Sequence, residues 1–171
     1  MNNRAVFLDR DGTLNEEIFD INLNKTRPPW RVSEFKLKPN VIESLQTIHK
    51  AGYLLFIVTN QPDHAKNNVS LKSLVEIRNH VFSTLYESNV WIKDDYYCFH
   101  HPSVCNCECR KPSPYFLLQA SKIYDIDLSQ SWMVGDRATD IECGKRARTK
   151  TILIDNKTQI KEATQIILGD K

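Results

Sequence analysis

Residues 5–15 read Ala-Val-Phe-Leu-Asp-Arg-Asp-Gly-Thr-Leu-Asn, and the change from apolar to charged side chains within this stretch decides the fold. The four successive apolar residues, 5–8, predict a short strand of the kind that a parallel sheet buries on both faces. Because burial ends where charge begins, we expect Asp9 and Asp11 at the carboxyl end of this strand, where open α/β sheets place their ligand sites.

Asp9 and Asp11 are two positions apart, so both carboxylates point the same way in an extended segment. Two carboxylates at one spot repel each other unless a cation lies near them, and hard oxygen ligands favour Mg²⁺. The alternative is an ordinary turn in which the carboxylates accept hydrogen bonds from local backbone amides. A calcium loop of the EF-hand type fits less well, because the ligands that it needs further along the chain are missing.

The length of 171 residues and the net charge of +2 predict one ordinary globular domain, residues 1–171, and do not indicate a nucleic-acid binder. No apolar run reaches the length of a membrane span, and the N-terminus lacks the features of a signal peptide. We therefore expect a cytoplasmic protein with no membrane partner, and a monomer is the working expectation. In that setting the five cysteines indicate metal ligands or thiols rather than disulfides.

Short apolar runs alternate with amphipathic stretches along the chain. This alternation predicts an α/β fold, a doubly wound Rossmann-like parallel sheet with helices on both faces. Residues 16–38 are polar and irregular and predict a surface loop, and neither this interval nor 60–110 leaves room for a separate cap domain. The predicted strands are 5–8, 54–58, 96–99, 132–134 and 151–154, and the predicted helices are 41–51, 71–85, 115–123 (through Tyr115, Leu118 and Ile123) and 140–146.

Polar side chains follow two other predicted strands at the point where each strand ends. Thr59 and Asn60 follow the second strand, Asp136 follows the fourth, and Lys111 precedes a proline in the loop before a helix. Each residue alone is more typical of a cap, a turn or a solvated loop. Together they place carboxylates, a hydroxyl and a lysine at one edge of one sheet. Phosphoryl transfer needs this set: a nucleophile, cations for the phosphate oxygens and a proton for the leaving group.

These residues resemble the four motifs of the haloacid-dehalogenase-like (HAD) phosphatases, and the resemblance runs from about residue 6 to residue 154. The motifs stand in this chain as Asp9-Arg10-Asp11-Gly12-Thr13, Thr59-Asn60, Lys111, and Gly135-Asp136 with Asp140. The first motif, continued by Leu-Asn, together with a cysteine-rich loop ending in Cys-Arg-Lys-Pro, is similar to one subfamily. That subfamily holds the D-glycero-D-manno-heptose 1,7-bisphosphate phosphatases and the histidinol-phosphate phosphatases.

The resemblance implies how the first and last motifs act. Asp9 would be the nucleophile that takes the phosphoryl group. Asp11 would protonate the leaving oxygen and then deprotonate the water that hydrolyses the aspartyl-phosphate. A catalytic Mg²⁺ would bind the carboxylates of Asp9 and Asp136 and the backbone carbonyl of Asp11.

The resemblance also implies the roles of the middle motifs. Thr59 would hydrogen-bond the phosphoryl oxygens, and Lys111 would neutralise charge on the nucleophile and the phosphate. Asp140 would orient Lys111 or a metal-bound water. Arg110 would read the substrate, although a surface arginine that bonds only solvent is the alternative. The residues implied to contact the substrate are Thr13, Asn60 and Arg110.

The segment 98–109 carries four of the five cysteines and His100, which makes five candidate ligands for a tetrahedral site that takes four. Short spacings between soft ligands predict zinc, and free thiols or a disulfide are the alternatives. The subfamily pattern implies Cys98, His100, Cys107 and Cys109 as the zinc ligands, with Cys105 in place of Cys107 as the alternative. A full set of protein ligands leaves no position for water, so this Zn²⁺ would be structural.

The resemblance implies a Mg²⁺-dependent phosphomonoesterase acting on a small sugar phosphate, with heptose 1,7-bisphosphate as the leading substrate. The alternatives are histidinol phosphate, a polynucleotide 3′-phosphate and a catalytically inactive zinc-loop scaffold. The chain departs from the subfamily after Gln61, where members typically carry a small-residue turn and an Arg-Gly pair and this chain has Pro-Asp-His-Ala-Lys-Asn-Asn at 62–68. Lys66 could replace the charge of that arginine but not its bidentate fork. The departure concerns the distal part of the substrate.

Overall fold

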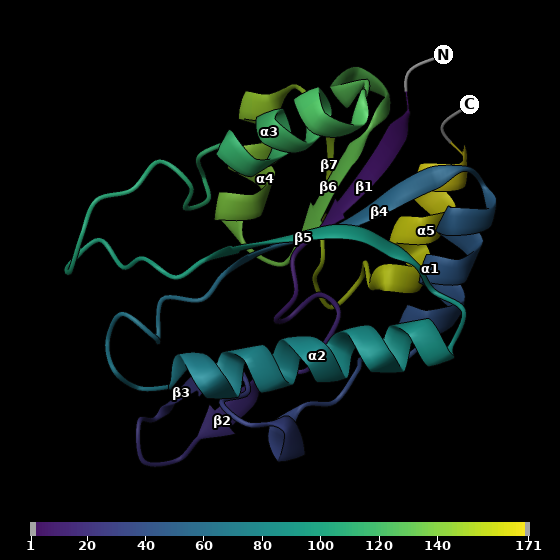
Figure 1. The fold of residues 1–171 in the computed structure, drawn as a ribbon. Coiled ribbons are helices and arrows are strands. Elements are labelled where there is room, and N and C mark those ends of the chain that lie inside the picture. The colour runs from purple at the N-terminus through teal and green to yellow at the C-terminus, as the bar shows by residue number, and fades with distance from the viewer. Residues whose placement is uncertain (1–2, 170–171) are drawn as a thin grey trace.

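The computed structural model describes residues 3–169 and contains a five-stranded parallel sheet with the order β5-β4-β1-β6-β7 (Figure 1). The strand that carries the first motif, β1, lies in the middle, paired with β4 on one side and with β6 on the other. The predicted doubly wound α/β fold is therefore confirmed. The strands of this sheet are β1 (Arg4–Leu8), β4 (Tyr53–Asn60), β5 (Ile92–Cys98), β6 (Trp132–Gly135) and β7 (Lys150–Leu153).

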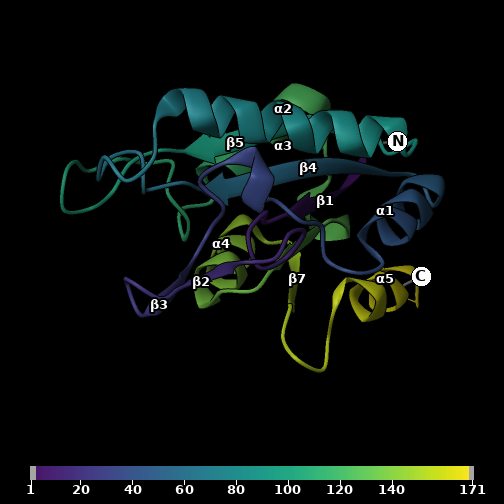
Figure 2. The same cartoon turned by 90° about the horizontal axis from the view of Figure 1, so that it is seen from below.

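Helices cover both faces of the sheet, and two hydrophobic cores lie beneath them (Figures 1 and 2). Val6 and Leu8 of β1 face one core, whereas Ala5 and Phe7 face the other, because successive side chains of a strand point to opposite faces. The first core is shared with α1 (Val41–Lys50), α2 (Leu71–Glu87) and α5 (Ile160–Gly169), and the second with α3 (Tyr115–Tyr124) and α4 (Ala138–Ala147). No helix of the described residues is long and apolar enough to cross a membrane.

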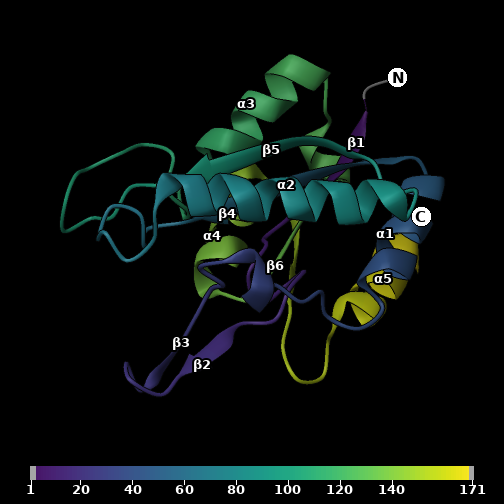
Figure 3. The same ribbon diagram turned by 60° about the horizontal axis from the view of Figure 1, so that its bottom comes forward.

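The interval 16–38, predicted as an irregular loop, contains an antiparallel hairpin of β2 (Ile18–Asp20) and β3 (Lys25–Arg27), followed by the 3-10 turn η1 (Val32–Glu34). The hairpin extends away from the main sheet (Figure 3). Its strands are too short for a period-two pattern, and Arg27 holds it together through ion pairs to Asp20 and Glu34. Between β1 and α1 the structure describes only this hairpin and η1, so no separate cap domain is inserted there.

Two further elements differ from the sequence expectation. The strand predicted at 96–99 begins at Ile92 and ends at Cys98. The helix predicted after Pro114 is present as α3, but the apolar residues that marked it in the sequence are not its core residues: Leu118 and Ile123 are exposed, and Leu117 and Ala120 are buried. This helix is apolar on more than one side, so its periodicity alone does not define the buried face.

Candidate active site

The carboxyl ends of β1, β4 and β6 meet at one edge of the sheet, and a pocket of about 320 Å³ opens there. We call its inner, buried end the floor. Its side chains come from the ends of β1 and β4, from the loop before α3 and from the start of α4. The floor consists of Asp9, Asp11, Thr59, Lys111 and Asp140, of which every side chain is buried. The structure thus brings together residues that are as much as 131 positions apart in the chain (9 and 140).

Lys111 is at the centre of the floor. Its Nζ donates to Asp9 Oδ1 at 2.8 Å and to the Val58 carbonyl at 2.6 Å, and it lies 2.6 Å from Asp140 Oδ1. Burial on its own lowers the pKa of this amine, but Asp9 and Asp140 outweigh that effect, and the pKa of Lys111 is raised. The lysine therefore carries a fixed positive charge beside Asp9.

Asp11 is held by three side chains for which the sequence had indicated no role. Arg10, whose side chain is fully buried, forms a bidentate contact in which Nη2 lies 2.9 Å from both carboxylate oxygens. Asn15 Nδ2 donates to Asp11 Oδ1 at 3.0 Å, and Gln61 Nε2 donates to Oδ2 at 2.6 Å. Gln61 also donates to Thr59 Oγ1 at 2.9 Å. These donors fix the carboxylate of Asp11 in one orientation.

Asn60 lines the pocket, and its amide is used within the protein. Its Nδ2 donates to the carbonyl of Lys111 at 3.2 Å, and its Oδ1 accepts from the backbone N–H of Lys111 at 3.1 Å. This reciprocal pair fastens the segment that carries Lys111 to the end of β4.

Gly12 and Asp136 meet at a close approach that only glycine permits. Gly12 has a φ of +79°, and a Cβ placed on it would lie 2.3 Å from Asp136 Oδ2. Burial, followed by the neighbouring charge of Asp9, raises the pKa of Asp136 to about 7. The Oδ1 atom of Asp136 is buried and has no hydrogen-bond partner.

Oxygen atoms of Asp9, Asp136 and Asp140 lie within 4.8 Å of one another. Asp140 is committed to other partners, because Lys111 holds Oδ1 and the backbone N–H of Arg137 donates to Oδ2 at 3.0 Å. The oxygens that remain for a cation therefore belong to Asp9 and Asp136. A buried carboxylate oxygen without a partner and a set of hard donors fit Mg²⁺.

A second cluster lies in the loop between β5 and α3. Ligand atoms of Cys98, His100, Cys107 and Cys109 all lie within 4.8 Å of one another. The Cys98–Cys107 Sγ distance is 3.7 Å, and His100 Nδ1 lies 3.7 Å from Cys98 Sγ and 3.3 Å from Cys109 Sγ. A tetrahedral zinc site with its usual bond lengths has S–S edges of about 3.8 Å and S–N edges of about 3.6 Å. The four side chains fit zinc, and Cys105 is exposed outside the group.

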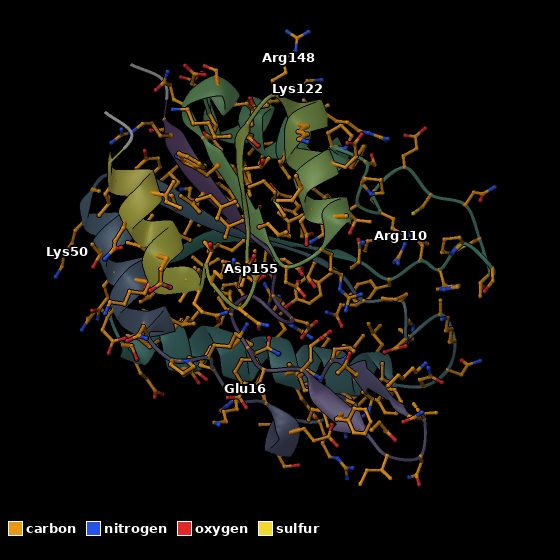
Figure 4. The ribbon with its side chains drawn as sticks, turned by 180° about the vertical axis from the view of Figure 1, so that it is seen from behind. Glu16, Lys50, Arg110, Lys122, Arg148 and Asp155 are labelled. Atoms are coloured by element: carbon orange, nitrogen blue, oxygen red, sulfur yellow. The ribbon has the colours of Figure 1, made fainter. Side chains whose placement is uncertain are left out.

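Two of the residues predicted to contact the substrate have different placements. Arg110 lines the pocket and donates from Nη1 to the His100 carbonyl at 3.3 Å (Figure 4). Thr13 is fully buried and is not among the residues that line the pocket. The structure therefore gives no surface by which Thr13 could contact a substrate in this pocket.

We call the outer end of the pocket the rim, and most of it was missed by the sequence analysis. The hairpin contributes Lys25 and Arg27, and the segment after it contributes Trp30. Trp30 Nε1 donates to Asp63 Oδ2 at 3.0 Å, which joins the hairpin side to the loop after β4. No periodicity marks these positions, because the hairpin brings them to the pocket through tertiary contacts. The rim consists of Lys25, Arg27, Trp30, Asp63, Arg110 and Arg137.

The comparisons with known proteins agree with this geometry. A family model described as HAD-hydrolase-like matches residues 108–166. A D-glycero-beta-D-manno-heptose-1,7-bisphosphate 7-phosphatase from Haemophilus influenzae is 37% identical over 86% of this chain and 79% of its own length. A D-glycero-alpha-D-manno-heptose-1,7-bisphosphate 7-phosphatase from Photorhabdus laumondii is 34% identical over 84% of this chain and 78% of its own length.

Among solved structures, the D,D-heptose 1,7-bisphosphate phosphatase from B. bronchiseptica, complexed with magnesium and phosphate, has the same fold. It aligns with a TM-score of 0.83 at 20% identity and covers 98% of this chain and 99% of its own.

Proposed function

The chain belongs to the HAD-like phosphatases, and from that membership we propose that it is a Mg²⁺-dependent phosphomonoesterase that removes the phosphate at carbon 7 of a heptose 1,7-bisphosphate. The contact that carries this proposal is the one between Asp9 and Lys111, a buried carboxylate held beside a buried ammonium at the sheet edge. The names of the relatives supply the substrate class.

The proposed reaction has two steps on one carboxylate. A carboxylate oxygen of Asp9 attacks phosphorus, so that an O–P bond forms while the bond from phosphorus to the ester oxygen breaks. Asp11 gives its proton to the departing ester oxygen. In the second step Asp11 takes a proton from water as that water attacks phosphorus, and the Asp9 carboxylate leaves with the electron pair of the broken O–P bond. Inorganic phosphate is the product.

The surrounding residues hold these two carboxylates in place. Arg10, Asn15 and Gln61 fix the orientation of Asp11, so its carboxyl group faces the ester oxygen in one position. Lys111 supplies positive charge beside Asp9, where the phosphate oxygens arrive. Thr59 Oγ1 lines the same floor and is free to donate its hydrogen, because it accepts from Gln61.

Asp9, Asp136 and the backbone carbonyl of Asp11 would hold the Mg²⁺. When bound, the ion stabilises negative charge on the phosphate and relieves the repulsion between Asp9 and Asp136. Burial and the charge of Asp9 raise the pKa of Asp136 to about 7. This supports the assignment, because a nearby cation stabilises the ionised form of a carboxylate that burial and a like charge disfavour.

Cys98, His100, Cys107 and Cys109 would hold a structural Zn²⁺. The chain runs from Cys109 directly into Arg110 and Lys111, so the cluster would fix the start of the segment that delivers Lys111 to the floor. We also propose that the protein acts as a monomeric single domain in the cytoplasm.

The test is Mg²⁺-dependent phosphate release from heptose 1,7-bisphosphate and from histidinol phosphate, measured side by side with Asp9→Asn as the blank. We expect a preference of about a hundredfold or more for the bisphosphate, which corresponds to about 2.7 kcal/mol in transition-state binding. A preference for histidinol phosphate would overturn the substrate, and the absence of release from any phosphate ester would favour an inactive scaffold.

A further inference from the structure

Part of the pocket lining is apolar, although most of the residues that line the pocket are charged or polar. We call this part the apolar wall, and it consists of Pro28, Trp30 and Pro62. Pro28 and Trp30 lie in the segment after β3, and Pro62 lies in the loop after β4. Because Trp30 donates to Asp63, the residue after Pro62, the two segments meet at this wall.

The indole of Trp30 is fixed by several contacts. The backbone N–H of Trp30 donates to Glu34 Oε2 at 3.0 Å, and its Nε1 donates to Asp63 Oδ2 at 3.0 Å. The guanidinium of Arg27 lies 4.1 Å from the centre of the ring and is itself held by Asp20 and Glu34. The ring is therefore ordered before a ligand arrives, so binding against it requires little further ordering of the side chain.

One face of this indole is available to a ligand. Arg27 lies over the other face, and Asp63 takes the N–H at the edge of the ring. Within residues 3–169, no aromatic ring packs against Trp30. Trp30 is partly exposed and lines the pocket. The face opposite Arg27 is therefore the one that a substrate can reach.

A flat apolar surface above a charged floor suits a phosphate ester whose leaving group is a ring. A pyranose carries its hydroxyls around the edge of the ring and C–H groups on its faces. One face can pack against an indole while the hydroxyls stay with water or polar side chains. An open-chain polyol has no flat C–H face. The apolar wall therefore adds binding for a cyclic leaving group in particular.

The loop 62–68, in which the chain departs from its subfamily, contributes to this wall. Pro62 and Asp63 line the pocket, whereas Lys66 is exposed and does not line it. The departure thus supplies the pocket with a proline and with the carboxylate that accepts from Trp30. Its effect on the substrate is exerted through the apolar wall.

We propose that Trp30 determines the specificity for the leaving group, because the ring of a cyclic sugar stacks on the indole face opposite Arg27. The enzyme then selects phosphate esters of cyclic sugars over esters of open-chain polyols. This inference rests on the proposed function, because it narrows the substrate class of the same pocket. It concerns the carbon skeleton of the substrate and assigns no role to its phosphates.

The test measures binding to the whole protein with Mg²⁺ in an Asp9→Asn background, by calorimetry. The two probes are heptose 1,7-bisphosphate in its ring form and heptitol 1,7-bisphosphate, an open-chain counterpart with the same two phosphates. We expect the cyclic probe to bind at least about tenfold more tightly. Trp30→Leu should reduce this ratio to about threefold or less, because the remaining preference reflects only the flexibility of the open chain.

Two further variants control for effects on the structure. Trp30→Phe keeps an aromatic face and should leave the ratio within about threefold of its original value. Trp91→Leu is the matched control, because Trp91 packs against Tyr86 and does not line the pocket, and it should change neither affinity. Thermal unfolding shows whether each variant is folded.

A second measurement leaves the apolar wall unchanged. In saturation-transfer NMR on the Asp9→Asn protein, irradiation of the aromatic protons should transfer magnetisation mainly to the C–H protons on one face of the sugar ring. Uniform transfer around the ring would contradict stacking.

Each other outcome overturns a stated part of the proposal. Equal affinity for the two probes with Trp30 intact would show that the pocket does not select a ring. An unchanged ratio in Trp30→Leu, with or without an equal loss of both affinities, would show that Trp30 does not act on the ring. Failure of the proposed function is seen separately, as absence of phosphate release from the bisphosphate by the enzyme with Asp9 intact.

Discussion

The floor and the rim of the pocket are built in opposite ways. At the floor, Lys111 and the carboxylates of Asp9 and Asp140 are buried, and each charge has a partner. At the rim, Lys25 and Arg110 lie on a hairpin and a loop and have no carboxylate partner among the described residues. The floor is preorganised for one reaction on a phosphate, whereas the rim leaves charge available for the rest of the substrate. Mutations at the two ends should therefore change different kinetic constants.

The largest effect is expected from Asp9→Asn. The change removes the nucleophile, so turnover should fall by at least about a thousandfold. Lys111 keeps Asp140 and the Val58 carbonyl as partners, so the melting temperature should stay within a few degrees. Phosphate release and thermal unfolding, measured on the same preparation, check both parts. Turnover near that of the unmodified enzyme would refute the role of Asp9.

Lys111→Met tests whether the floor depends on paired charge. The variant leaves Asp9 and Asp140 buried without their common cation, and breaking such a buried pair costs about 3–5 kcal/mol in the free energy of unfolding. Chemical denaturation gives this free energy. Lys72→Met, at a side chain that is 86% exposed, is the control and should stay within about 0.5 kcal/mol. Equal stabilities for Lys111→Met and Lys72→Met would show that the paired charges of the floor do not stabilise the protein.

Cys109→Ser tests the loop that joins the floor to the rim. The variant should lose zinc and show a lower melting temperature, because a structural zinc contributes folding free energy directly. Activity should fall with the metal content, since Arg110 and Lys111 follow the cluster. Metal analysis and thermal unfolding are the measurements. Cys105→Ser is the matched control, and zinc loss there instead would replace the proposed ligand set.

Trp30→Phe sharpens the comparison at the rim. Phenylalanine keeps an aromatic ring under Arg27 and removes the N–H that donates to Asp63. One hydrogen bond contributes about 1 kcal/mol to the stability of the rim, so we expect KM for the bisphosphate to rise by at most about fivefold while kcat is unchanged. Steady-state kinetics separate the two constants. A change in kcat with KM unaffected would show that the Trp30–Asp63 hydrogen bond supports the chemical step rather than substrate binding.

The smallest effect is expected in the pH dependence of stability, through Glu34, the partner of the rim residue Arg27. The side chain of Arg27, with Trp30 and Arg31 adding hydrogen bonds, holds the pKa of Glu34 at about 2, below its ordinary value of 4.5. A lowered folded-state pKa means that the stabilisation is complete above pH 4.5 and is lost as the pH falls towards 2. Denaturation curves at several pH values should show that Glu34→Gln flattens this part of the profile, whereas an unchanged slope would exclude Glu34.

Asp9, Asp11 and Thr59 of the floor could be predicted from the sequence because they follow strands, whereas Lys111 and Asp140 were expected from the motifs that the chain shares with the HAD phosphatases. A run such as Leu54–Val58 defines a buried strand, and the position where it stops defines the place of Thr59. Parallel strands then bring these ends together without further information. The partners of Asp11 were missed because nothing in the pattern says that Arg10 is buried against its own neighbour in the chain.

Apart from Arg110, the residues of the rim could not be predicted, for a different physical reason. The strand β3 has three residues, and what holds it is the pairing of Arg27 with Asp20 and Glu34, seven positions away on either side. Such contacts leave no periodic trace in the sequence. The same limit applied to α3, where Leu117 rather than Leu118 reaches the core.

Trp30 also makes the pocket optically readable. The chain has three tryptophans, and the other two lie away from the pocket: Trp91 packs against Tyr86, and Trp132 is buried at the start of β6. Indole emission depends on the polarity around the ring, and Trp30 lines the pocket with its N–H on Asp63. A variant that keeps Trp30 as its sole tryptophan would report the filling of the rim through its own fluorescence, in real time and without an added dye.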